Sequence, residues 1–187
     1  MKIQMESLLN GKTIEVNFDE QIVFSHLAQD ESAVWSLLVA GGYLKVEDVD
    51  AMNYCMNKIT LATFSYFDVG SEGAGNQEPE RFYHGFVLGL IADQTDIYEI
   101  RSNRESGFGR YDIMLEPKHP GKDNAVILEF KVRSARKGKS LEETAQSAIA
   151  QIRERKYSEE LKMKGITDSQ IKEYGVAFEG KTVLIVD

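Results

Sequence analysis

Apolar side chains recur three or four residues apart in two stretches of the second half of the chain, as they do on a helix with one buried face. The first stretch is RFYHGFVLGLIA, residues 81–92, and it follows Pro79, which is well suited to a first helical turn. The second begins after Ser140, which can form a capping box with Glu143, and extends to about Tyr157. We therefore predict two helices in this half of the chain.

Shorter runs rich in β-branched and aromatic residues predict strands around these helices. Residues 96–103, 109–117 and 125–132 lie between the two helices, and residues 174–180 and 181–187 follow the second one. The segment KHPGKDN, between the second and third runs, contains a Pro-Gly pair typical of a turn, so these runs should form a hairpin. The predicted order is helix, three strands, helix, strands.

The N-terminal third of the chain has a different organisation. TIEVNF alternates like a short strand, and Asp30 is a suitable cap for a helix through ESAVWSLLVAG. We expect a small helix-and-strand module over residues 1–66, a glycine-rich linker over residues 67–79, and a second domain over residues 80–187. The abrupt start of the module suggests a fragment of a longer protein.

Composition is typical of a soluble globular protein: the 187 residues are 42% hydrophobic and 28% charged. No apolar run approaches the ~20 residues of a membrane span, and the N-terminus lacks the apolar stretch of a signal peptide. We therefore expect a cytoplasmic protein without a membrane partner. The single cysteine, Cys55, can form neither an internal disulfide nor a Cys-rich zinc site, and we expect it to be a small buried hydrophobe.

Charge is unevenly distributed along the chain. The net charge is −8, which argues against a nucleic-acid partner, yet residues 101–140 carry 10 basic and 5 acidic side chains. This one basic segment surrounds the predicted hairpin. A solvated loop is the alternative explanation, because KVRSARKGK has the composition of a flexible surface.

Two carboxylates should meet on the hairpin. A turn centred near Pro120-Gly121 pairs residues whose numbers sum to about 241, so Asp112 is expected opposite Glu129, with Cβ atoms ~5 Å apart. Two carboxylates that close repel each other unless a proton or a cation lies between them. Mg²⁺ prefers this oxygen-only environment, with one or two carboxylates and several retained waters.

Lys131 adds a positive charge to the acidic pair. Side chains alternate along AVILEFKV, so Glu129 and Lys131 share one face, while the opposite face is apolar. Beside a metal ion, the ammonium could orient or deprotonate an attacking water and offset charge on a phosphate. The alternative is a surface hairpin in which Lys131 pairs with Glu129 or Asp112 across solvent.

Several separated motifs resemble one known family. ERFYHGFVLGL, SNRESGFGRYDIMLEP, ILEFKV, QIRERKY and YGVAFEGK are similar, in order, to the PD-(D/E)XK nuclease superfamily, and the resemblance runs from about Glu78 to the C-terminus. More narrowly, they resemble the nuclease-like domain that follows an AAA-type ATPase-like domain in many bacterial proteins. The resemblance implies an α/β (α+β) fold, a restriction-endonuclease-like mixed sheet flanked by helices in the order αβββαβ.

The resemblance also implies Mg²⁺- or Mn²⁺-dependent hydrolysis of phosphodiester bonds in DNA or RNA. In that comparison Asp112 is the metal-binding aspartate, and Glu129 and Lys131 are the (D/E)xK pair. The backbone carbonyl of Phe130 is a further metal ligand, and Glu80 corresponds to an acidic residue that many members place in the first helix.

Supporting residues follow from the same comparison. Gln151 borders the buried face of the second predicted helix, where some branches place a glutamine and a tyrosine one turn apart. Tyr157 is six positions on, about 240° round the helix, so we expect it to pack in the core. His84 shares a helix face with Glu80 but is expected to be a packed or capping group.

Two arginines are candidates for substrate phosphates. Arg104 and Arg110 flank the segment in which Gly107 and Gly109 bracket Phe108, just before Asp112, and glycines there give backbone freedom for a close approach. The alternative is a tight turn with solvated charges.

A different class of function stays open. A catalytically silent nuclease-fold module could bind nucleic acid or protein beside an ATPase-like partner, and the acidic first hundred residues favour it. LLNGKTIEVNFDEQIVF and WSLLVAGGYLKV resemble the tail after such an ATPase-like region, yet no GxxxxGKS/T phosphate loop is present, which excludes ATP hydrolysis by that mechanism. A carbohydrate hydrolase fits less well, since two carboxylates need no lysine for that chemistry.

Overall fold

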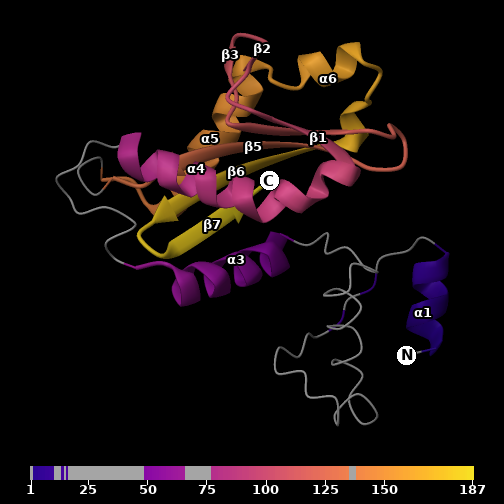
Figure 1. Ribbon diagram of the computed structural model, residues 1–187, viewed down its shortest axis with the longest axis horizontal. Helices are drawn as coiled ribbons and strands as arrows, with labels where there is room; N and C mark the ends of the chain where they lie inside the picture. Colours follow the sequence, from indigo (N-terminus) through magenta and orange to yellow (C-terminus); the bar gives the residue numbers. More distant parts are fainter. Residues whose placement is uncertain (1, 11–13, 15, 17–48, 66–76, 135–137) are drawn as a thin grey trace. The chain divides into compact units, whose positions relative to one another are not determined.

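The computed structural model describes residues 2–10, 14, 16, 49–65, 77–134 and 138–187 (Figure 1). It divides into two compact units, Met1–Asp48 and Val49–Asp187. In the first unit it describes a short helix, α1 (Lys2–Leu9). The strand expected at TIEVNF falls almost entirely outside the described residues, and the helix expected after Asp30 lies wholly outside them.

The second unit is built on a five-stranded mixed sheet with the strand order β1-β4-β5-β6-β7. The strands are β1 (Tyr98–Ser102), β4 (Ile113–Pro117), β5 (Ala125–Val132), β6 (Ile171–Glu179) and β7 (Thr182–Val186). Only β5 and β6 are parallel, and the other neighbours are antiparallel. A separate hairpin, β2 (Glu105–Ser106) and β3 (Gly109–Arg110), connects β1 to β4.

Helices cover both faces of the sheet. They are α3 (Val49–Thr63), α4 (Gln77–Ile91), α5 (Leu141–Arg155) and α6 (Glu159–Met163), with short 3₁₀ turns at Ala92–Asp96 and Asp168–Gln170. α5 begins with the predicted capping box of Ser140 and Glu143 and makes the crossover between the parallel strands. The predicted restriction-endonuclease-like α+β fold is therefore confirmed.

The two faces of β5 enter two different cores. Phe130 packs with residues of α4, including Tyr83 and Val87, whereas Ile127 packs with residues of α5, including Ile152. The predicted alternation is correct, but the face that carries Glu129 and Lys131 is also buried along most of its length. Both faces of a strand are typically covered where helices flank a sheet on each side.

Helix α3 protects the edge strand β7. The side-chain amide of Asn53 exchanges hydrogen bonds with the backbone of Ile185, and the amide of Asn57 does the same with Val183. Four helical residues advance about 6 Å, close to the length of two strand residues, so the spacing of the amides matches the strand. The helix thereby satisfies backbone groups that an edge strand would leave exposed.

The position of α3 differs from two expectations. The helix belongs to the same compact unit as the sheet, which begins at Val49 rather than after residue 66. Cys55, expected to be buried, is exposed; Met52 and Met56, on either side of it, pack against the core instead. No helix in the described part of the chain is long and apolar enough to cross a membrane.

Candidate active site

The β4–β5 hairpin brings Asp112 beside Glu129, in the register predicted from the turn. Ile113 pairs with Leu128, and Asp112 immediately precedes β4. The Oδ2 atom of Asp112 accepts a 2.8 Å hydrogen bond from the main-chain N–H of Phe130, the residue after Glu129. The charges of the two acids are close enough to affect each other's ionisation.

Glu129 is buried although it is ionisable. The residue is 4% exposed, and its Oε2 atom makes no hydrogen bond within the described part of the chain. Burial, followed by repulsion from Asp112, raises the pKa of Glu129 from its ordinary 4.5 to about 8, and the charge of Lys131 only partly opposes this. Near neutral pH this carboxyl therefore keeps a proton unless a cation compensates its charge.

The pKa of Asp112 is also raised, chiefly because its side chain is buried. The hydrogen bond from Phe130 and the charges of His84, Lys131 and Arg110 oppose that increase. Two neighbouring acids whose burial disfavours ionisation form a site that a cation would stabilise.

Gln151 joins the two members of the ExK pair. Its Oε1 atom accepts a 2.7 Å hydrogen bond from Nζ of Lys131, and its Nε2 atom donates to Oε1 of Glu129. Since an ammonium can only donate, the amide orientation is fixed by Lys131. This contact and the burial of Glu129 show that the hairpin is not the solvated one considered above.

Tyr157 takes part in this network, contrary to the expectation of core packing alone. Helix α5 ends at Arg155, and Lys156 adopts a left-handed conformation with φ of 54°, so the 240° helical separation does not apply. The Tyr157 hydroxyl accepts a hydrogen bond from Nε2 of Gln151 at 3.3 Å and donates to the Arg110 carbonyl at 2.8 Å. The ring is also buried, as predicted.

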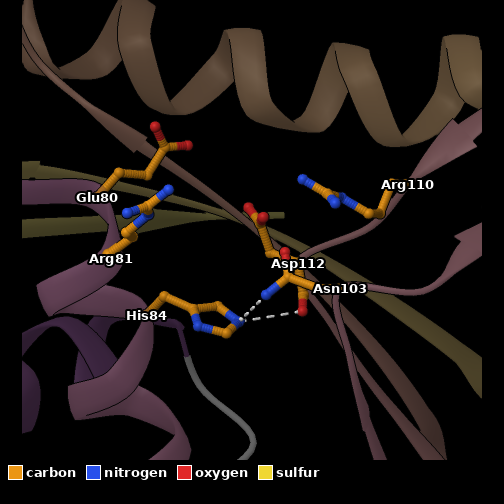
Figure 2. Close-up of a pocket in the computed structure, with 6 residues that line it drawn as sticks. All are labelled: Glu80, Arg81, His84, Asn103, Arg110 and Asp112. Carbon is orange, nitrogen blue, oxygen red and sulfur yellow. Dashed lines mark hydrogen bonds between the residues drawn. The ribbon is translucent and has the colours of Figure 1, made fainter. Parts of the chain in front are cut away.

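A pocket of about 380 Å³ lies in front of Asp112 (Figure 2). It is lined by Glu80, Arg81, His84, Asn103, Arg110 and Asp112. The Nε2 atom of His84 lies 3.0 Å from Oγ of Ser102, 3.2 Å from Nδ2 of Asn103 and 3.3 Å from the Asp112 carbonyl. His84 also packs edge-on against the Phe130 ring. It therefore combines the expected packing with a position at the pocket.

The pocket includes some predicted residues and omits others. Glu80 and Arg110 line it, and the charge of Glu80 contributes to the raised pKa of Glu129. Arg104 is not among the lining residues. Sequence reasoning missed Asn103. In the structure this residue has a positive φ of 52°, a conformation that asparagine tolerates well.

The donor set suits a hard divalent cation. The described residues contain no cluster of three or more His, Cys, Asp and Glu side chains able to hold a metal ion. Asp112 and Glu129 nevertheless offer two neighbouring carboxylates, one with an oxygen that has no hydrogen-bond partner in the described part of the chain. Mg²⁺ is commonly held by one or two carboxylates and several waters. The metal role of the Phe130 carbonyl stays a prediction.

Comparison with known proteins gives one match. A family model described as the PD-(D/E)XK nuclease superfamily matches residues 78–187, and nucleases of this superfamily generally use divalent metal ions. No curated protein and no solved structure matches the chain significantly. The matched segment covers α4 from its second residue, the whole sheet and α5, and it includes every residue of the candidate site. This chain belongs to the PD-(D/E)XK nuclease superfamily.

Proposed function

We propose that this chain is a nuclease that hydrolyses phosphodiester bonds of DNA or RNA with Mg²⁺ or Mn²⁺. The observation that carries the proposal is the buried Glu129 carboxylate, which lies beside Asp112 and two positions before Lys131 and has one oxygen without a hydrogen-bond partner among the described residues. Asp112 and Glu129 would hold the ion, and Glu80, which lines the same pocket as Asp112, would be a further ligand. The catalytic domain would comprise residues 80–187, to which α3 adds the cover of the sheet edge.

The chemistry divides between the ion and the side chains. A bound divalent ion polarises a phosphoryl oxygen and lowers the pKa of a coordinated water. Lys131 orients the attacking water and compensates the charge that develops on the phosphate. Gln151 restrains Lys131 and Glu129 together, so that ammonium and carboxylate keep a fixed separation.

Arginine side chains supply substrate binding in this proposal. Arg110 is exposed and lines the pocket that contains Asp112, so its guanidinium can meet a phosphate there. Arg104 is exposed on the segment before β2, where it would contact a more distant phosphate. Both contacts hold the nucleic-acid backbone and are independent of base sequence.

The direct test is cleavage of a mixed panel of DNA and RNA by wild type and Lys131→Ala with Mg²⁺ or Mn²⁺. We expect the variant to cleave at least about 100-fold more slowly. Lys172→Ala is the matched control, because this exposed lysine pairs with Val126 near the opposite end of β5. Equal rates for wild type and Lys131→Ala, or no cleavage of any substrate by wild type, would refute the proposal.

A catalytically silent binding module is the second candidate. It is favoured by the lack of a three-ligand cluster in the described residues and by the acidic first hundred residues. In that role the domain would work in the cytoplasm beside an ATPase-like domain or protein. Titration calorimetry with Mn²⁺ separates the candidates: no binding, with unchanged nucleic-acid affinity of Asp112→Asn, supports the silent module.

A further inference from the structure

Phe108 stands at the tip of the β2–β3 hairpin with its side chain in solvent. It is 70% exposed, whereas Phe130 and Phe178 are 1% and 0% exposed. A large apolar ring that stays exposed loses the free energy that burial would provide. Single exposed apolar side chains are common on protein surfaces, so what distinguishes Phe108 is its position close to the candidate site.

The exposure is built into a tightly held hairpin. The Phe108 N–H donates to the Arg155 carbonyl at 2.8 Å, and Nη1 of Arg155 donates to the Phe108 carbonyl at 3.1 Å. The Ser106 hydroxyl donates to the Tyr157 carbonyl at 3.0 Å. Gly107 has φ of +60°, and a Cβ atom there would lie 2.3 Å from the Arg155 carbonyl oxygen. The hairpin is thus fixed on the end of α5, and the ring is displayed from a rigid support.

Positively charged residues lie on the hairpin that displays the ring and on the helix end that supports it. The ammonium of Lys156 lies 5.8 Å from the ring centroid, and Arg104, Arg110 and Arg155 are exposed on the same hairpin or on the end of α5 beneath it. Glu105, which pairs with Arg110, is the one carboxylate of the hairpin itself. Aromatic rings among cations are the groups with which proteins bind single-stranded nucleic acids, through base stacking and phosphate contacts.

The hairpin also leads directly into the candidate site. Arg110 lines the pocket with Asp112, and Phe108, in the turn, precedes Arg110 by two residues, so their Cα atoms are at most about 7 Å apart. A nucleic acid whose phosphate contacts Arg110 therefore has a neighbouring nucleotide within reach of Phe108. In a duplex that base would be paired and stacked, so only an unpaired base could lie on the ring.

We propose that Phe108 is a stacking platform for an unpaired base, so that this site selects single-stranded nucleic acid over duplex. The inference rests on the proposed function, because it assigns the substrate class of the same site. Stacking on Phe108 would supply the preference for single strands, while Arg110 and its neighbours would supply the contacts common to all nucleic acids.

Binding without cleavage tests this inference. Affinities are measured in EDTA for a fluorescently labelled single-stranded DNA of about 12 nucleotides, for the RNA of the same sequence, and for the corresponding blunt duplex. We expect Phe108→Ala to bind both single strands about 5- to 100-fold more weakly and to bind the duplex as wild type does. Phe108→Tyr should retain wild-type affinity, because tyrosine also stacks.

Two controls separate stacking from other effects. Tyr54→Ala removes another exposed aromatic side chain, on α3 at the β7 edge of the sheet, and should leave every affinity unchanged. The dependence of log K on log salt should keep its slope in Phe108→Ala and become shallower in Arg110→Ala, since only the second variant loses a phosphate contact. Thermal unfolding of Phe108→Ala checks that the variant is folded.

The inference is overturned if Phe108→Ala or Phe108→Leu binds single strands as tightly as wild type does. It is also overturned if wild type does not prefer single strands to duplex. These measurements use no divalent ion and need no turnover. The two proposals can therefore fail separately. An absence of nuclease activity would not change the binding result, and an absence of stacking would not change the cleavage test with Lys131→Ala.

Discussion

Glu129 illustrates how one residue links the site to the stability of the fold. Its carboxyl group has its pKa raised to about 8 by burial and by Asp112, so between pH 4.5 and 8 the folded protein holds a proton that the unfolded chain has released. The unfolded state then binds fewer protons than the folded state, and the free energy of unfolding falls as pH rises. The loss of unfolding free energy is complete above about pH 8, where the carboxyl is ionised in both states.

This linkage gives a first prediction. In EDTA, wild type should lose a few kcal/mol of unfolding free energy between pH 5 and 8, and Glu129→Gln should lose clearly less because it cannot ionise. Urea unfolding at a series of pH values measures both curves. Glu142→Gln, an exposed glutamate of α5, is the control and should follow wild type. Parallel curves for wild type and Glu129→Gln would show that the buried carboxyl does not hold the extra proton.

Residue-level reasoning from sequence succeeded where local rules determine the geometry. The Pro-Gly turn and the strand alternation predicted the register that sets Asp112 beside Glu129, because both are fixed by residues close in the chain. The contact of Tyr157 with Gln151 was missed, because it depends on Lys156, a non-glycine residue in a left-handed conformation. Sequence gives little warning of a helix end of that kind.

At the scale of elements, the contact between the β2–β3 hairpin and α5 can be tested through Gly107. Gly107→Ala combines an unfavourable positive φ with a steric conflict against Arg155. Gly121 also has a positive φ, of 93°, but has nothing within 4 Å of an added Cβ atom. Gly121→Ala should cost about 1–2 kcal/mol from backbone strain, and Gly107→Ala clearly more. Equal costs, measured by urea unfolding, would mean that the hairpin does not rest on α5.

The junction of α3 with β7 supports a further prediction. Asn57→Ala leaves the N–H and C=O groups of Val183 without their amide partner, which should lower the unfolding free energy by about 1–3 kcal/mol. Combined with Asn53→Ala, it should also promote self-association through the uncovered strand, seen as concentration-dependent light scattering. Tyr54→Ala, on the outer face of α3, should do neither. A stable, monodisperse double variant would show that the amides contribute little.

Elements of low periodicity were hard to predict from sequence. The strands of the β2–β3 hairpin have two residues each, too few for an alternation to be visible, so the run 109–117 looked like one strand. The attachment of α3 depends on contacts between residues more than a hundred positions apart. Local patterns contain no record of such pairings, and the expected boundary near residue 66 consequently differs from the structural one.

At the scale of the whole molecule, the unit Val49–Asp187 contains both cores and every residue of the candidate site. A protein limited to these residues should unfold in one cooperative transition. A shorter protein that begins at Gln77 lacks Phe64 and the apolar face of α3, which belong to one of the cores, and should unfold at lower urea concentration. Identical midpoints for the two proteins would show that α3 is dispensable for the fold.

The amide pairs between α3 and β7 also restrict how the helix can be seated. Sliding α3 by one turn in one direction would bring Asn57 opposite Ile185 but leave Leu61 facing Val183. Sliding it the other way would bring Asn53 opposite Val183 but leave Val49 facing Ile185. After either shift, only one of the two strand residues would still have an asparagine side chain as its hydrogen-bond partner. Apolar helix–sheet contacts alone tolerate such shifts, so the two asparagines fix one position of this helix along the strand.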